Sequence, residues 1–174
     1  MDIVNMRPDH LAALQRLAAE LRLHPVDTPR ALRFGTLEDD TSPPELRLLA
    51  LDGGDVVGFC LACLREDAGV IKLFGVAPQH RRRGIATALF DEAEARLAAR
   101  GAQRLAVEGA APHWFFPGVE VTRTAAVSFL LARGYETDRV ARVDMRVDLH
   151  RTDLDTSAAL AGLERDGIVL RRAL

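Results

Sequence analysis

Residues 73–86 of this 174-residue chain read LFGVAPQHRRRGIA, and this stretch decides how the rest of the sequence is organised. Its first four residues close an apolar strand, which ends at Pro78 because a proline ring has no N–H to offer a central ladder. A basic turn follows the proline. Beyond the turn, apolar residues at four-residue steps predict a helix with one buried stripe, formed by Ile85, Leu89, Ala93 and Leu97.

The turn between the strand and the helix has the composition of an anion-binding site. The first four N–H groups of a helix lack a carbonyl partner, and the helix dipole adds roughly half a positive charge there. Gly84 and Ala86 are small enough to let a phosphate reach the backbone, and guanidinium groups suit phosphate geometry, here those of Arg81, Arg82 and Arg83. The alternative is a solvated basic loop before an ordinary surface helix, but the buried strand before the turn favours an anion site.

Val76-x-Pro78 followed by Arg81-x-x-Gly84-x-Ala86 and a long amphipathic helix resembles the acyl-CoA signature of the GNAT superfamily of N-acyltransferases. In that family the turn holds the pyrophosphate of coenzyme A, and the preceding strand pairs with the pantetheine arm. The GxGxxG dinucleotide fingerprint and the GxxxxGKS/T phosphate loop are both absent from the sequence. The resemblance implies acetyl-CoA as co-substrate, bound by Phe74, Val76, Arg81, Arg82, Arg83, Gly84, Ile85, Ala86, Thr87 and Phe129.

The size and charge of the chain exclude several classes of protein. A single domain of this length buries a sufficient core without a metal or disulfides. Hydrophobic residues make up 48% of the chain and charged residues 28%, and a net charge of −2 offers no general attraction for nucleic acid or anionic membranes. No apolar run approaches a membrane span and no signal segment precedes the first expected strand, so we expect a cytoplasmic protein.

The two cysteines of the chain, Cys60 and Cys63, lie three residues apart in a predicted strand, so their side chains point to opposite faces. A redox C-x-x-C requires a helix start, and two thiols are too few for a closed structural zinc site. We therefore expect two small core residues and no metal site.

The remaining hydrophobic patterns predict an α/β (α+β) fold of the GNAT kind. Tight turns predict an antiparallel meander of three strands, Glu45–Leu51, Val56–Arg65 and Val70–Val76. The helix after the basic turn leads into a further strand, Arg104–Val107, and such a crossover implies a parallel pair. If these two strands part at their ends, they leave a slot beside the turn. In all, we expect a mixed, mostly antiparallel sheet of about seven strands flanked by about four helices.

The other expected elements lie on either side of this central part. They are strands at Asp2–Met6 and, as one or two strands, Tyr135–Leu149, and helices at Asp9–Leu23, Pro29–Leu37 and Thr122–Arg133. In the family resemblance, the polar segment between the first helix and the meander lines the acceptor pocket.

Residues 151–174 are predicted to form an extension to a domain made by residues 1–150. A helix at Asp153–Glu164 precedes a strand at Ile168–Arg172, which echoes the opening run from Ile3 to Arg7. Such a segment is the start of a second copy of the domain or a strand that adds to a sheet edge. That edge belongs to this chain or to a partner in a homodimer.

A second GNAT signature is matched only in part. The family commonly shows Asn-x-x-Ala-x-x-Phe-Tyr-x-x-x-Gly-Phe, and the residues that fit are Ala126, Phe129, Gly134 and Tyr135. Arg123 stands at the Asn place and Leu130 at the Tyr place. In the family that tyrosine often protonates the departing thiolate, so this chain lacks the usual general acid.

The general base is sought among carboxylates and histidines near the expected slot. Val70 stands where some members of the family place a glutamate, which leaves Glu108 as the first candidate, with His113 and Glu120 on the following loop. We expect an N-acetyltransferase that moves an acetyl or short acyl group from acetyl-CoA to a primary amine. The alternative is a non-catalytic acyl-CoA-binding module or a degenerate half of a tandem GNAT protein.

Overall fold

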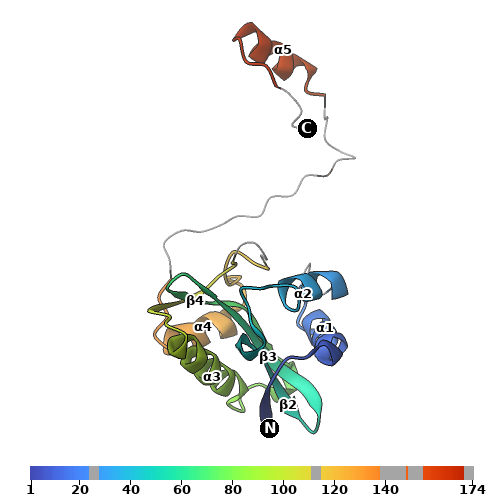
Figure 1. Ribbon diagram of the computed structural model, residues 1–174. Helices are drawn as coiled ribbons and strands as arrows, with labels where there is room; N and C mark the ends of the chain where they lie inside the picture. Colours follow the sequence, from blue (N-terminus) through green and yellow to red (C-terminus); the bar gives the residue numbers. More distant parts are fainter. Residues whose placement is uncertain (24–27, 111–114, 138–147, 149–154, 171–174) are drawn as a thin grey trace. The chain divides into compact units, whose positions relative to one another are not determined.

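The computed structural model describes residues 1–23, 28–110, 115–137, 148 and 155–170 (Figure 1). The chain divides into two compact units, Met1–Thr137 and Asp138–Leu174. The expected boundary between residues 150 and 151 falls outside the described residues, so the division into a domain of residues 1–150 and an extension stays a prediction.

A mixed sheet forms the centre of the first unit (Figure 1). Its strands are β1 (Asp2–Asn5), β2 (Arg47–Asp52), β3 (Asp55–Arg65), β4 (Ala68–Val76) and β5 (Arg104–Val107), and their order in the sheet is their order in the sequence. Neighbours from β1 to β4 are antiparallel, while β4 and β5 are parallel. The predicted meander and the predicted parallel pair across a helical crossover are both confirmed.

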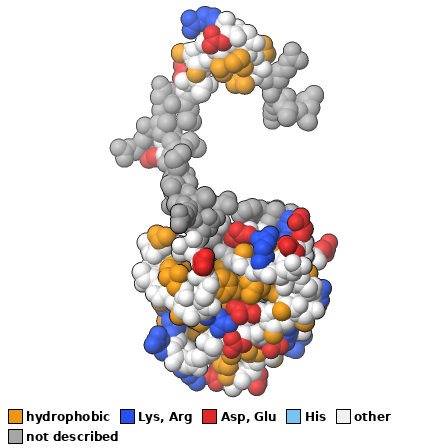
Figure 2. All heavy atoms as spheres, turned by 90° about the vertical axis from the view of Figure 1, so that its left-hand side faces the viewer, with side chains coloured by type: hydrophobic (Ala, Val, Ile, Leu, Met, Phe, Trp, Pro, Cys, Tyr) orange, Lys and Arg blue, Asp and Glu red, His pale blue; other side chains and the backbone are white. Residues whose placement is uncertain are grey.

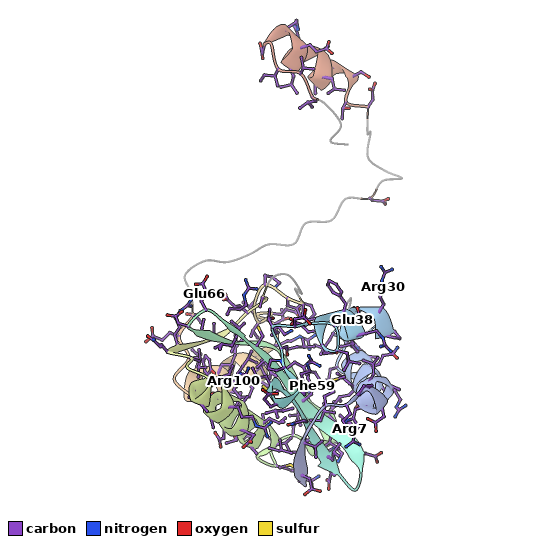
Figure 3. The ribbon with its side chains drawn as sticks, viewed as in Figure 1. Arg7, Arg30, Glu38, Phe59, Glu66 and Arg100 are labelled. Carbon is purple, nitrogen blue, oxygen red and sulfur yellow. The ribbon has the colours of Figure 1, made fainter. Side chains whose placement is uncertain are left out.

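Helices cover both faces of this sheet. They are α1 (Leu11–Glu20), α2 (Pro29–Gly35), α3 (Ile85–Ala99) and α4 (Thr124–Ala132), and α5 (Ser157–Arg165) belongs to the second unit. Helices α1 and α2 lie on one face, and α3 and α4 lie on the other (Figure 1). Successive side chains of β3 point to opposite faces of the sheet, which produces this division. Phe59 packs in the hydrophobic cluster with α1, called the α1 cluster, and Cys60 packs in the cluster with α3, called the α3 cluster. Phe59, fully buried, marks the centre of the unit in Figure 3.

The two cysteines are buried free thiols, as small core residues should be. Burial raises the pKa of the Cys60 thiol, which keeps it protonated and unreactive. Among the described residues, no group of three His, Cys, Asp or Glu side chains is arranged to hold a metal ion.

The strand and helix counts differ from those predicted. The described residues contain five strands and five α-helices rather than about seven strands and four flanking helices. Most of Tyr135–Leu149, predicted as one or two strands, lies outside the described residues. The expected last strand is wrong for its described part, because Ile168–Leu170 joins no ladder there and at least half of each side chain is exposed. An apolar triplet without a partner strand gains no hydrogen bonds from the extended conformation.

The observed N-terminal ends of two helices differ from the predicted ends by two residues. The first helix begins at Leu11 rather than Asp9 because Pro8–His10 forms a separate 3₁₀ turn, and α4 begins at Thr124 rather than Thr122. No helix within the described ranges is both long and apolar enough to cross a bilayer.

Candidate functional site

The basic turn leads into α3 through a backbone that leaves the helix start open. Gly84 is the N-cap residue at φ 79°, a left-handed conformation that favours glycine. Because glycine has no side chain, no capping hydrogen bond occupies the helix start. The first bond of the helix joins the N–H of Ala88 to the carbonyl of Gly84 over 3.0 Å. No described group accepts a hydrogen bond from the three amides before it, those of Ile85, Ala86 and Thr87. These three N–H groups at a positive helix end can therefore bind an anion.

The three arginines of the turn have different surroundings. Arg81 Nε donates to the carbonyl of Val76 over 3.1 Å, which fastens the turn to the end of β4. Arg83 Nη2 lies 3.1 Å from Asp52 Oδ2 of the β2–β3 hairpin. The side chain of Arg82 has no hydrogen bond or ion pair to any described residue. Arg82 is therefore the guanidinium most available to an incoming phosphate.

Strand β4 is longer than its parallel partner β5, so part of its edge pairs with no described strand. The β4–β5 ladder ends at the pair Ile71 and Val107, and the N–H of Glu108 then donates to the carbonyl of Ile71 over 3.2 Å. Strand β4 continues to Val76 with no described strand on that side. At about 3.3 Å per residue, the free edge from residue 72 to residue 76 is about 13 Å long. This edge runs from the closed end of the expected slot to the basic turn.

A buried ion pair stands at the closed end of that edge. Lys72 is the extra residue of β4 where the register with β3 shifts, and its side chain is completely buried. Its ammonium forms an ion pair with Asp39, donates to the carbonyl of Gly35 over 2.8 Å and lies 5.5 Å from the centre of the Phe115 ring. The pair thus fixes the strand to the end of α2 and to the loop that follows it.

The surroundings of Asp39 favour the ionised form of its carboxyl. Burial raises the pKa of its carboxyl, but hydrogen bonds from Lys72 and Thr41 outweigh that effect and leave the pKa below its usual range. The N–H and the hydroxyl of Thr41 donate to Oδ1 over 2.8 and 2.6 Å. The sequence reasoning missed this pair. Lys72, as the single charge within an apolar strand, was the signal that could have revealed it.

Two of the residues assigned to the coenzyme come together through an aromatic row. The ring of Phe90, from α3, stands edge-on to Phe74 of β4 and to Phe129 of α4, with 5.0 Å between ring centres in both pairs. The row joins the end of β4 to α4 across the α3 face. Figure 2, which views the unit from the left-hand side of Figure 1, shows hydrophobic side chains gathered on this face among charged ones.

The candidate bases are placed very differently. Glu108 directly follows the last residue pair of the β4–β5 ladder, at the point where the two strands diverge, and it is exposed. The carboxylate of Glu120 accepts from the Thr122 hydroxyl and from Arg123, and these bonds lower its pKa, which makes it a weak base at neutral pH. His113 lies outside the described residues. Leu130, at the place of the family's tyrosine, is buried in the α3 cluster and has no proton to give.

The structure thus brings Phe74, Val76 and the turn residues 81–87 to one end of β4, with Phe129 attached through Phe90. Glu108 stands at the other end of the free edge. The roles of these residues toward a ligand stay a prediction.

Comparisons with known proteins agree with this geometry. The model of the acetyltransferase (GNAT) family matches residues 11–117, more than half of the chain and all of the turn. No curated protein matches the chain significantly by sequence.

Solved structures share the fold. An aminoglycoside N-acetyltransferase, AAC(6')-Iy, in complex with CoA superposes with a TM-score of 0.64 at 23% identity, over 84% of this chain and 95% of that one. The GCN5-related glucosamine N-acetyltransferase region of a fungal multi-domain β-N-acetylglucosaminidase gives 0.70 at 21% identity, over 80% and 17%. The ribosomal-protein-S18-alanine N-acetyltransferase from Escherichia coli gives 0.60 at 19% identity, over 76% of each chain.

Proposed function

This chain belongs to the acetyltransferase (GNAT) family, and from that premise we propose that it transfers an acetyl or other short acyl group from acetyl-CoA to a primary amine. One observation carries the proposal. A helix start with three amides and an arginine that bond no described residue adjoins a strand edge that pairs with no described strand over five residues. A diphosphate fits the helix start, and an extended arm with amide groups fits the strand edge.

In the proposed complex, the diphosphate accepts from the amides of Ile85, Ala86 and Thr87, and Arg82 adds charge. The pantetheine arm follows the edge of β4 from Val76 toward Lys72. This direction brings the thioester toward the point where β5 leaves β4. Glu108 stands at that point. Support for this pose comes from the fold, since a family relative of the same architecture was crystallised with CoA.

The reaction begins with a neutral amine. An alkyl amine with a pKa of about 10.4 is deprotonated about once in 2,500 at pH 7, which costs roughly 4.6 kcal/mol. Its nitrogen attacks the thioester carbonyl, and backbone N–H groups on the edge of β4 beside the thioester, near residue 72, stabilise the oxyanion. The carbon–sulfur bond then breaks, the thiolate leaves with the electron pair, and the amine proton goes to the base. We assign that base to Glu108, and a placed base contributes about 10²–10⁴-fold.

The departing thiolate receives its proton from solvent in this proposal. Leu130 replaces the hydroxyl that the family often supplies at that place. A thiol with a pKa of about 8.5 is a good leaving group, so the reaction can proceed without a dedicated acid.

A second candidate function is a non-catalytic acyl-CoA-binding module. The observations in its favour are the buried Leu130 and the low pKa of the Glu120 carboxyl, which together remove two of the groups that catalysis would use. The two candidates share the coenzyme site and differ only in turnover.

Release of free thiol from acetyl-CoA, measured across a panel of primary amines, separates the two. The panel should contain an aminoglycoside, a glucosamine, a peptide N-terminus and a polyamine. Amine-dependent thiol release that Glu108→Gln reduces at least tenfold supports the transferase with its assigned base. Tight binding of acetyl-CoA without release on any amine supports the binding module. A cytoplasmic location and a homodimer through the C-terminal segment stay predictions.

A further inference from the structure

Helix α4 is held at both ends by arginines. At its start, Arg123 donates to two consecutive carbonyls of the end of α1, from Nη1 to Leu21 over 3.1 Å and from Nη2 to Arg22 over 3.0 Å. At its end, Arg133 Nη2 lies 2.8 Å from Asp91 and 2.7 Å from Glu94, both on α3. The two ties differ in kind, because the first has uncharged backbone acceptors and the second has carboxylates.

The two ends of α4 are tied to opposite faces of the sheet. Leu21 packs in the α1 cluster and lies directly over β4, where a Cβ at Gly75 would stand 2.5 Å from its Cδ1 atom. Phe129 and Leu130 of α4 pack in the α3 cluster. The tie made by Arg123 therefore joins the two faces beside the last residues of β4, where the strand has no β5 partner.

Arginine suits this tie better than lysine would. The last carbonyls of a helix carry partial negative charge and lack intrahelical partners. Arg22 adopts a left-handed backbone with φ 53° at the end of α1. A planar guanidinium fork reaches the two neighbouring carbonyls at once, whereas a lysine ammonium is a single point of charge. Glu120 Oε2, 3.0 Å from Arg123 Nε, orients the fork from its other side.

We infer that Arg123 is a positioning residue, which fixes the distance between α4 and the unpaired edge of β4. This inference rests on the proposed function, because that edge is where the pantetheine arm is proposed to lie. Arg123 acts through the helix rather than through the diphosphate. Its loss should loosen the site along the arm and leave the anion site at the start of α3 intact.

The test uses two ligands that differ only by the pantetheine arm, dephospho-CoA and ADP, both measured by calorimetry and by competition. In Arg123→Ala, we expect the affinity for dephospho-CoA to fall about five- to tenfold, which corresponds to the net contribution of one typical hydrogen bond. The affinity for ADP should change less than twofold. Arg123→Lys should recover part of the loss, to within about threefold of the wild type. Arg16→Ala is the matched control, since it removes an exposed arginine of α1 that has no described partner.

Equal loss of both ligands in Arg123→Ala would mean a general structural effect and overturn the inference, as would unchanged affinity for dephospho-CoA. Failure of the proposed coenzyme site looks different, because the wild type itself would then bind neither ligand, and failure of catalysis alone would leave both affinities measurable without turnover. Hydrogen exchange of the unliganded protein supplies a readout independent of any ligand. Faster exchange in Arg123→Ala at the end of α1 and the start of α4, and not in α3, supports the tie, and unchanged exchange at both places contradicts it.

Discussion

Replacement of Gly84 by aspartate is the perturbation that examines the anion site most closely. Gly84 caps α3 at φ 79°, and a Cβ there would meet no atom within 4 Å. An aspartate side chain therefore has room, but its backbone would be strained. A left-handed L-residue costs roughly 1–2 kcal/mol, and a carboxylate at a helix start returns about 0.3–1 kcal/mol. The net loss of unfolding free energy should therefore be small, about 1 kcal/mol.

The effect on coenzyme binding should be much larger. A carboxylate about 4 Å from a diphosphate repels it by about 1 kcal/mol per charge even at the dielectric constant of water. Two charges give about 2 kcal/mol, which corresponds to a loss of about 30-fold in affinity at the least. Isothermal titration of CoA into the wild type and the variant measures this loss directly.

Gly101 supplies a matched control at the other end of the same helix. It has φ 94° and no atom within 4 Å of a Cβ, so the strain of an aspartate is similar. The added charge at a helix C-terminus is unfavourable, so Gly101→Asp should destabilise the fold more than Gly84→Asp does. It should nevertheless bind CoA like the wild type. If Gly84→Asp retained full affinity, or if both variants lost it equally, the reasoning about the turn would be refuted.

Three further predictions concern the closed end of the β4 edge. Lys72→Met should lower the unfolding free energy in urea by about 3–5 kcal/mol, because it removes the cation of a buried ion pair and keeps the buried Asp39 carboxylate. Lys72→Met/Asp39→Leu should recover most of the loss, and equal stability of the single and double variants would contradict this. Folding lowers the pKa of Asp39, so its contribution to stability is present above about pH 4 and is lost as the pH falls below that value. The free energy of unfolding should therefore fall less steeply with decreasing pH in Asp39→Asn than in the wild type. An unchanged slope argues against the ion pair. Gly35→Val should unfold at least 5 °C lower in calorimetry, since a Cβ there overlaps the Phe115 ring, whereas an unchanged melting temperature would place that ring elsewhere.

The parts of the fold that follow from local chemistry were readable in the sequence. The strand, the basic turn and the helix of residues 73–99 depend on neighbours along the chain, and the structure has them where they were expected. The meander was readable for the same reason, because tight turns fix which strands pair. The terminal strand was not, since Ile168–Leu170 has an extended pattern but no described partner.

The parts of the site that depend on distant residues could not be read. Lys72 contacts Asp39, which lies 33 positions away in the sequence, and Arg123 contacts Leu21, which lies 102 positions away. No local pattern indicates such partners. Arg123 was visible in the sequence only as a departure from a family signature. Its contacts give that departure a physical meaning, because the guanidinium ties two helices that an asparagine side chain is too short to join in this way.

The claim on which the whole account depends is that amides at the start of α3 hold a diphosphate. Amide NMR of the ¹⁵N-labelled protein during titration with CoA tests this most directly. The largest shifts should fall on Ile85, Ala86 and Thr87, with smaller ones along β4 toward residue 72. Saturable binding that leaves those three amides unmoved, or no binding at all, would contradict the account.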